Sequence, residues 1–250
     1  MTEHAAGRRT IGASISGWLK SAVFRVRVGA ARLIYNRILL SMVTDVEWCS
    51  RLYPLLDSDF GEQVLIVGPQ SFAAALSFAR RHPDVCFVAV EPHESRRYAR
   101  SARRRDLNNV NLIEVPANAE LPFTDEAFDT IVCNFALHSL VPVNKIALLR
   151  GLTPLLRQGG RLHVVELVRP AASREAKMLG FAAVLWGTEA VAPHFDDTWR
   201  SCLSLAGLRA LAPDRSFSIV AGRISVVVAS RKRPGSKSIR DPKREPKDKD

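Results

Sequence analysis

The sequence predicts an α/β fold, a doubly wound and mostly parallel sheet with helices on both faces. Its first sign is the apolar run 64–67, which ends at Gly68 and is followed by the alanine-rich segment 73–80. This order of strand, turn and helix is typical of the opening of a doubly wound unit. A second apolar run, 87–90, ends at Glu91. Near-continuous apolar strands that alternate with helical segments indicate a sheet covered on both faces.

The remaining elements continue this alternation. Strands are expected at residues 64–68, 85–90, 110–115, 128–133, 161–167 and 223–229. Helices are expected near residues 70–81, 94–105, 143–156 and 173–188. Residues 198–205 predict one more helix, which Gly207 ends, and an antiparallel last strand fits the end of the domain.

Four regions are expected along the 250 residues. Residues 1–13 are expected to be disordered, 14–60 to form an N-terminal helical extension, and 61–230 to form the main domain. Residues 231–250 make a basic tail with three prolines and almost no apolar side chains, a composition that predicts disorder.

The positive charge lies at the two ends of the chain. The formal net charge is +11; residues 1–44 carry +6 and 231–250 carry +5, so that 45–230 is neutral. Basic ends suit an anionic partner, either a lipid surface or a nucleic acid. A nucleic-acid substrate is disfavoured, because the neutral middle shows no interleaved aromatic and basic residues.

The segment 14–44 allows two interpretations. Its composition favours helices, but Arg25, Arg27, Arg32 and Arg37 leave no single apolar face. It would form either helices packed on the main domain or a basic interfacial helix on an anionic membrane. Because these charges break the apolar run, neither a membrane span nor a cleavable signal is expected.

The cysteines predict the cellular compartment. Cys49, Cys86, Cys133 and Cys202 are far apart and show no paired spacing. This pattern favours a reduced, cytoplasmic protein, peripheral at the membrane if its basic ends bind lipid, without a structural metal. The oligomeric state is not indicated.

Glu91 is the strongest candidate site residue. A carboxylate at the carboxyl tip of the second strand is placed to bind the ribose hydroxyls of a nucleotide-like cofactor. The alternative is a solvent-facing carboxylate beside the start of a helix.

Several motifs resemble the S-adenosylmethionine-dependent methyltransferases of Rossmann-like fold (methyltransferase type 11). Residues 120–129 match the pattern LPF-x-D-x-x-FD, and residues 155–162 are similar to the turn L-x-P-G-G-x-L. Residues 164–170 resemble the E-F-x-x-P strand end of the ubiquinone and menaquinone C-methyltransferases, and residues 31–36 resemble the opening of that branch. The resemblance implies a seven-stranded sheet.

It also implies S-adenosylmethionine as cofactor, held at the carboxyl ends of the strands. Gly68 would let the backbone turn beneath the cofactor, with Gln70 in the same loop, and Glu91 would bind its ribose. Asn118 would lie near the adenine, and Asn134 would border the reacting methyl group. Methyl transfer from a sulfonium depends mainly on alignment and water exclusion, and it needs no metal.

The cofactor loop departs from the family pattern acid-x-Gly-x-Gly-x-Gly. Ile66 stands in place of the acid, and Gln70 and Phe72 stand in place of the second and third glycines. A Cβ narrows the approach of the backbone to a ligand, and the ring of Phe72 is expected where the cofactor's amino-acid end passes. Ala117 replaces an acid that contacts the adenine amine, and Asn118 is the expected substitute.

His138 and Glu166 are the candidate acceptor-side residues. His138 would act as a base toward a phenolic acceptor or pack at the start of a helix. Glu166 would line the acceptor pocket or pair with Arg169. The arginines within 96–105 would form a solvated helix face or a phosphate-binding surface.

Two functions remain open. The first is a methyltransferase that acts on a lipophilic small molecule, such as a quinone-type ring, at an anionic membrane surface. The second is a catalytically inactive descendant of the same fold that binds or scaffolds a partner, which the altered cofactor loop motivates. A nucleic-acid methyltransferase is a weaker third interpretation.

Overall fold

The computed structural model describes residues 60–232, apart from 93–94, 105, 117–118, 212–214 and 221, and a few residues before them (30–31, 34, 52 and 54–56). The expectations for residues 1–13, for most of the extension 14–60 and for the tail from 233 concern parts outside the described residues. The same holds for Asn118.

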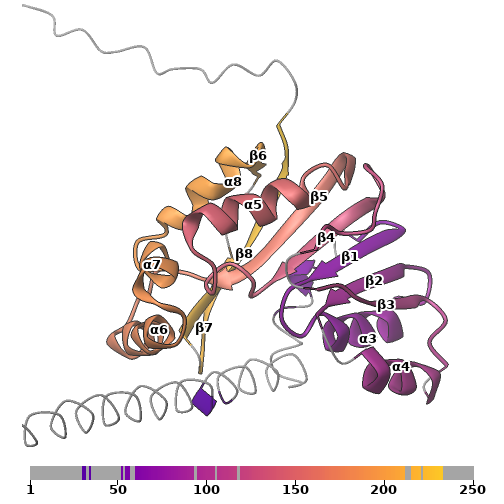
Figure 1. The fold of residues 1–250 in the computed structure, drawn as a ribbon, viewed down its shortest axis with the longest axis horizontal. Helices are drawn as coiled ribbons and strands as arrows, with labels where there is room; N and C mark the ends of the chain where they lie inside the picture. The colour runs from indigo at the N-terminus through magenta and orange to yellow at the C-terminus, as the bar shows by residue number, and fades with distance from the viewer. Residues whose placement is uncertain are drawn as a thin grey trace, which may run out of the picture.

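A single mixed sheet runs through the centre of the domain (Figure 1). Its strands are β1 (Gln63–Val67), β2 (Cys86–Glu91), β3 (Val110–Glu114), β4 (Phe128–Asn134), β5 (Leu156–Leu167), β6 (Leu208–Ala210), β7 (Arg215–Ile219) and β8 (Gly222–Arg231). The order is β3-β2-β1-β4-β5-β8-β6, and β7 pairs with β8 as an eighth strand. Strands β1 to β5 are parallel, and β8 is antiparallel to β5. The predicted doubly wound sheet and its antiparallel last strand are confirmed; β7 adds to the seven expected strands.

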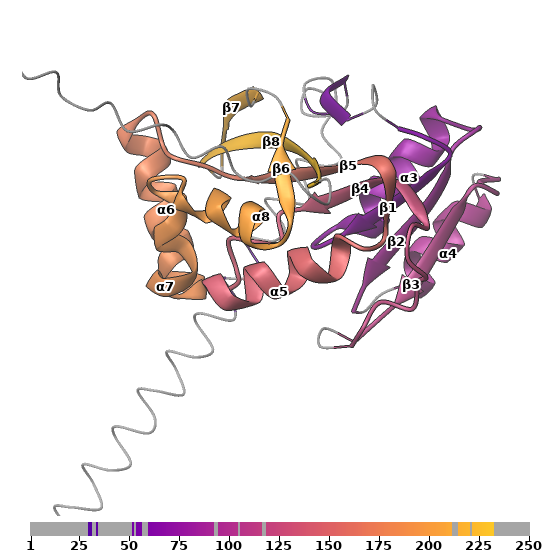
Figure 2. The ribbon, with the colours of Figure 1, turned by 90° about the horizontal axis from the view of Figure 1, so that it is seen from above.

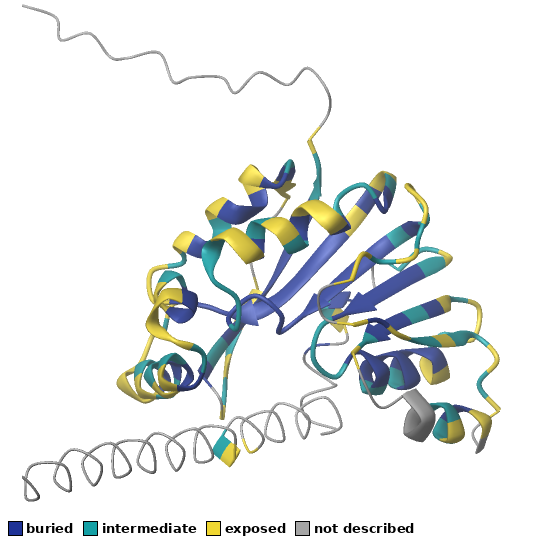
Figure 3. Cartoon of the chain, viewed as in Figure 1, coloured by how far each residue is buried: buried dark blue, intermediate teal, exposed yellow. Residues whose placement is uncertain are grey.

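Helices cover both faces of this sheet. They are α3 (Ser71–Arg81), α4 (Ser95–Arg104), α5 (Pro142–Leu152), α6 (Ser173–Trp186), α7 (Thr188–Val191) and α8 (Ser201–Leu205), with the 3-10 turns η2 (Ala192–His194) and η3 (Thr198–Arg200). In the view from above, α5 lies on the opposite side of the strands from α3 and α4 (Figure 2). Most residues of the central strands β1, β4, β5 and β8 are buried, whereas the outer helix faces are exposed (Figure 3).

The alternation of side chains along β1 explains the two layers. Val64 and Ile66 are buried in a cluster with residues of α3, α6 and α7, whereas Leu65 and Val67 are buried in a second cluster with residues of α5 and α8. Successive residues of a strand point to opposite faces, so a strand that is apolar throughout requires cover on both. Leu52, which precedes β1, is also buried in the first cluster.

The elements that sequence patterns miss are short or irregular. β6 has three residues, two of them exposed, and in β7 exposed polar residues alternate with half-buried apolar ones. β5 begins at Leu156 rather than 161, because residues 157–160 bulge out between the pairs Phe128–Leu156 and Thr130–Arg161. The expected glycine turn is therefore an interruption within a strand.

The last aspartate of the LPF motif has a structural role. Asp129 Oδ2 accepts a hydrogen bond from the Gln63 amide at 3.0 Å, and Arg157 Nη1 lies 2.9 Å from each carboxylate oxygen. Burial alone would raise the pKa of Asp129, but the Gln63 amide and the Arg157 guanidinium together hold it below its usual value. Asp129 joins β1, β4 and β5 at the edge of the sheet where β1 and β4 begin.

The turn between β1 and α3 lies against the carboxyl end of β4. Gly68 has φ +104°, and a Cβ built on it would be 2.2 Å from the carbonyl oxygen of Asn134. A hydrogen bond also joins the end of β4 to the turn, because Asn134 Nδ2 donates to the Pro69 carbonyl at 3.0 Å. Only glycine fits at position 68, because a side chain would meet backbone atoms that cannot move aside.

Gly68→Ala should therefore lower the free energy of unfolding by about 3 kcal/mol or more, from backbone strain and the forced contact together. Urea denaturation followed by circular dichroism measures the change. Gly180→Ala in α6, where nothing lies within 4 Å of the added methyl group, is the matched control. It should stabilise the protein by about 0.5–1 kcal/mol, and a Gly68→Ala protein as stable as this control would contradict the close packing.

Candidate functional site

The carboxyl ends of β1, β2 and β4 bring together four of the residues that the sequence singles out. Gly68 and Gln70 lie in the β1–α3 turn, Glu91 ends β2, and Asn134 ends β4. In open α/β sheets, ligands bind at the carboxyl ends of the strands where the strand order reverses, and here the chain leaves β1 toward β2 on one side and β4 on the other. The predicted cofactor site therefore lies at the position that the topology favours.

Gln70 retains a backbone conformation that glycine normally supplies. It has φ +67° and ψ +18° and stands immediately before α3. The left-handed region is accessible to non-glycine residues only at an energetic cost. The turn therefore keeps a glycine-like path at the position of the family's second glycine, even though the residue is not a glycine.

Glu91 is held at the N-terminus of α3. Its Oε1 accepts a hydrogen bond from the Phe72 amide at 2.8 Å, and the neighbouring Ser71 hydroxyl donates to the Val90 carbonyl at 2.7 Å. A carboxylate at this position satisfies a helix amide that has no partner within the helix and is favoured by the helix dipole. Glu91 is half-buried at the tip of β2. Its carboxylate therefore has a fixed position and caps α3.

The expectation for Phe72 is wrong. The residue is 0% exposed and belongs to the apolar cluster that also contains Ala75 and Phe78 of α3. Its ring is enclosed by the core and does not project into open space at the strand ends. The third glycine of the family pattern is thus replaced by a side chain that the core accommodates.

The side chain of Asn134 is buried and hydrogen-bonded within the protein. It is 4% exposed, and its amide holds the β1–α3 turn as described above. The next residue, Phe135, has φ +47°, is buried, and donates its amide hydrogen to the Val165 carbonyl. Asn134 therefore positions the cofactor loop, and its side chain is not exposed toward an acceptor.

His138 and Glu166 form a buried pair at the end of β5. His138 Nδ1 lies 2.8 Å from Glu166 Oε1, and the two residues are 1% and 0% exposed. Glu166 Oε2 also accepts hydrogen bonds from the amides of Leu137 and His138, at 2.6 and 3.2 Å. Burial would raise the pKa of Glu166, but His138 and these surroundings outweigh it and lower the pKa to about 2. The alternative partner, Arg169, is not bonded to Glu166; the carboxylate instead fixes the loop after β4.

A second buried polar pair, Lys145 and His194, was not predicted from the sequence. The ammonium group of Lys145, which is 0% exposed, donates to the Ala190 carbonyl at 2.6 Å and lies 3.0 Å from His194 Nε2. His194 Nδ1 lies 2.7 Å from the Leu167 carbonyl, so the neutral tautomer with its proton on Nδ1 satisfies both neighbours. Burial lowers the pKa of Lys145 to about 8 and that of His194 to about 4.

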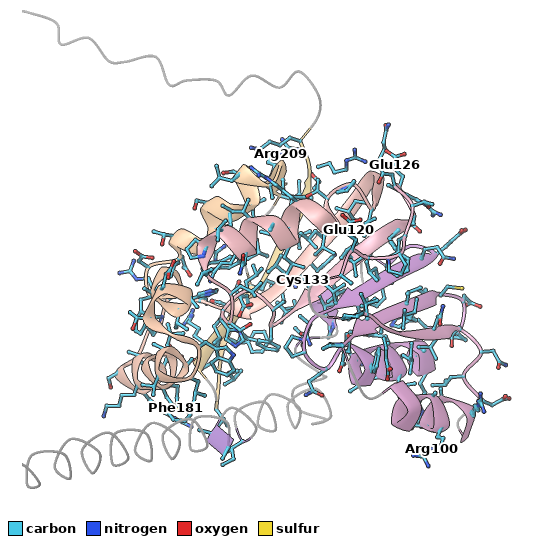
Figure 4. The ribbon with its side chains drawn as sticks, viewed as in Figure 1. Arg100, Glu120, Glu126, Cys133, Phe181 and Arg209 are labelled. Atoms are coloured by element: carbon cyan, nitrogen blue, oxygen red, sulfur yellow. The ribbon has the colours of Figure 1, made fainter. Side chains whose placement is uncertain are left out.

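Of the arginines within 96–105, the structure describes the side chains of two. On α4, Arg100 and Arg103 are exposed, and Figure 4 shows Arg100 at the outer side of that helix. Across the described part of the chain, His, Cys, Asp and Glu side chains nowhere gather in a group of three that could hold a metal ion. In the same part, no helix has the length and apolar character needed to cross a membrane.

The comparisons with known proteins agree with this fold. Residues 67–162 match the sequence profile of a family described as a methyltransferase domain. The match extends from the end of β1 into β5 and includes the LPF motif, so the resemblance to S-adenosylmethionine-dependent methyltransferases is confirmed.

A demethylmenaquinone methyltransferase of Tropheryma whipplei is 30% identical over 138 residues, which make up 54% of this chain and 55% of that protein. The chain thus spans about half the length of this relative.

Two solved structures share the architecture. LaPhzM superposes with a TM-score of 0.59 at 16% identity, covering 80% of this chain and 58% of that one. An O-methyltransferase from neocarzinostatin biosynthesis, NcsB1, solved with S-adenosylmethionine and 2-hydroxy-5-methyl naphthoic acid, has a TM-score of 0.56 at 16% identity and covers 73% and 54%. At 16% identity, these superpositions confirm the fold and carry no information about the activity of this chain.

The buried lysine predicts how stability changes with pH. The unfolded chain keeps the Lys145 proton up to its ordinary pKa of 10.5, whereas the folded chain releases it near 8. Between these values the unfolded state binds more protons, so this group makes the free energy of unfolding rise with pH.

Lys145→Met should remove this rise between about pH 8 and 10.5, as measured by urea denaturation at a series of pH values. Lys177→Met, which alters an exposed lysine on α6, is the control and should keep the wild-type pH profile. Parallel profiles for the wild type and Lys145→Met would show that the ammonium group is not desolvated in the folded protein.

Proposed function

We propose that this protein is an S-adenosylmethionine-dependent methyltransferase whose cofactor lies across the carboxyl ends of β1 and β2. The observation that carries the proposal is the combination of a glycine turn pressed onto the end of β4 and a carboxylate fixed at the tip of β2. When bound, the cofactor supplies an electrophilic methyl group on a sulfonium.

The residues of this turn suit that cofactor. Gly68 and Gln70 both have positive φ, so the backbone turns tightly at the ends of the strands. A nucleoside bound there would lie close to the main chain. Glu91 brings two carboxylate oxygens to the tip of β2, where they would accept charge-assisted hydrogen bonds from the two ribose hydroxyls. Phe72 adds no ring at the strand ends, because the core encloses its side chain.

The protein's own contribution to catalysis would be alignment and the exclusion of water. The Glu166–His138 pair holds the amides of Leu137 and His138, and so fixes the loop that follows β4. A rigid loop beside the methyl group would restrict where an acceptor can sit. Because both side chains are buried, we assign this pair a positioning role rather than a role in proton transfer.

The acceptor would be a lipophilic small molecule, and a quinone-type ring is the best-supported class. The 30% identical relative is named for demethylmenaquinone methylation. Apolar side chains are also exposed on α6, where Phe181 is 41% and Val184 62% exposed, and Figure 4 shows Phe181 at the outer side of the helix. The basic ends would hold the protein at an anionic membrane surface, where such acceptors are dissolved.

Isothermal titration of the full chain with S-adenosylmethionine tests the cofactor. Saturable binding is expected, and Glu91→Gln should weaken it about tenfold or more, since a hydrogen bond to a charged group contributes about 1.5–3 kcal/mol. The glutamine keeps an oxygen for the Phe72 amide, so α3 remains capped. Glu189→Gln on α7, an exposed carboxylate, is the control and should bind as the wild type does. Absence of heat at millimolar cofactor would instead support the inactive, scaffolding descendant.

Transfer of a tritiated methyl group to detergent-solubilised prenylated quinols tests the acceptor class. Labelling should be several-fold higher for a prenylated quinol than for the same ring without its prenyl chain, because the chain adds apolar surface to bury. Glu91→Gln should lower both rates. Cofactor binding without transfer to any quinol would overturn the acceptor class and leave the cofactor site intact.

A further inference from the structure

A pocket lies at the end of β5, bordered by η3, β7 and β8. It has a volume of about 590 Å³, and none of the residues proposed to hold the cofactor lines it. Its polar lining consists of Arg169, Arg200, Arg223, Asp197, Ser216 and Ser225. The volume falls within the range of about 300–1,000 Å³ that small-molecule sites occupy.

The charge of this lining favours an anion. Three guanidinium groups, which stay protonated in proteins, face one carboxylate. That carboxylate is partly engaged, since Asp197 Oδ1 accepts the Arg169 amide at 2.8 Å and Oδ2 lies 3.8 Å from Arg200 Nη2. The lining therefore carries a net positive charge, although residues 45–230 as a whole are neutral.

Two further carboxylates act on these arginines from outside the pocket. Glu175 is near Arg223 and Asp196 is near Arg169. Both are engaged locally: Glu175 accepts from the amides of Ala171 and Ala172 and from Ser218, and Asp196 accepts from Thr198. Glu175 and Asp196 therefore reduce the positive electrostatic potential of the pocket. The three guanidinium groups still line it.

Ser225 gives independent support for a ligand. The residue is 0% exposed, lines the pocket, and has a hydroxyl without a hydrogen-bond partner among the described residues. A buried polar group without a partner is costly and is rare in folded proteins. Across the β7–β8 ladder Ser225 faces Ser216, whose hydroxyl accepts from Arg223 Nη2 at 2.7 Å. Two hydroxyls and a guanidinium thus meet on one patch of the pocket wall.

We propose that this pocket binds the phosphate monoester group of a small molecule or of a lipid headgroup. Arginine forks match the oxygens of phosphate in geometry and charge, and serine hydroxyls donate to the same oxygens. The Ser225 hydroxyl would donate to a phosphate oxygen and so lose its unpaired state. The site is independent of the proposed methyl transfer, and it would couple the protein to a phosphorylated effector or to an acidic lipid.

Thermal shift and isothermal titration of the full chain with glycerol 3-phosphate test the site, against sodium chloride at equal ionic strength. The midpoint of unfolding should rise with phosphate concentration in the wild type. Arg223→Gln should weaken binding at least tenfold. Arg209→Gln, which changes an exposed arginine on β6 outside the pocket (Figure 4), should bind as the wild type does.

Ser225→Ala provides a second test that does not depend on a charge change. It should weaken phosphate binding several-fold while the unfolding midpoint without ligand stays equal or rises, because an unpaired buried hydroxyl is removed. A fall in the midpoint would show that the hydroxyl has a partner within the protein and would overturn this part of the inference.

Flotation with phosphatidylcholine vesicles, with and without phosphatidic acid, distinguishes the source of the phosphate. Pocket-dependent binding to phosphatidic acid vesicles, reduced in Arg223→Gln and retained in Arg209→Gln, would identify a lipid headgroup, because both variants keep the basic ends. Binding of the soluble monoester alone would identify a small molecule. Failure of every phosphate probe, or equal losses in the two arginine variants, would overturn the proposal.

Discussion

The close approach of the β1–α3 turn to the end of β4 determines the geometry of the candidate cofactor site. Gly68 can lie against the Asn134 carbonyl only without a side chain, and the Asn134 amide then holds the next carbonyl of the turn. This contact sets where α3 begins, and the Phe72 amide in the first turn of α3 in turn fixes Glu91. The loop and the acidic residue are thus positioned by one another, and the carboxyl ends of the strands have a defined shape before any ligand binds.

Near the carboxyl ends of β4 and β5, the structure depends on buried polar groups that satisfy one another. Glu166, wholly buried at the end of β5, keeps its charge because His138 and three backbone amides satisfy it. Nearby, Lys145 and His194 satisfy the carbonyls of Ala190 and Leu167. Buried polar groups of this kind are stable only when each finds its partner, so they specify the paths of the loops after β4 and β5.

Much of the fold could be predicted from the sequence because the central strands are apolar throughout. Runs such as 64–67 and 87–90 can be buried on both faces only in a covered, parallel sheet. β6 and β7 lie toward the antiparallel edge, where no continuous apolar run is needed, and they were missed. Positive φ at Gln70 and the inward direction of Phe72 were also missed, because both depend on how α3 packs against the sheet. The Lys145–His194 contact joins residues 49 positions apart, a separation at which local patterns carry no information.

The central claim is that the turn after β1 and the carboxylate of Glu91 still hold a sulfur nucleoside although two of the family's three loop glycines are absent. A crystal structure of the protein grown with S-adenosylhomocysteine tests this claim most directly. The account predicts the ligand across the ends of β1 and β2, with both ribose hydroxyls within hydrogen-bond distance of Glu91. A strand-end region without ligand, in crystals grown at saturating concentration and with Glu91 bonded only to α3, would contradict it.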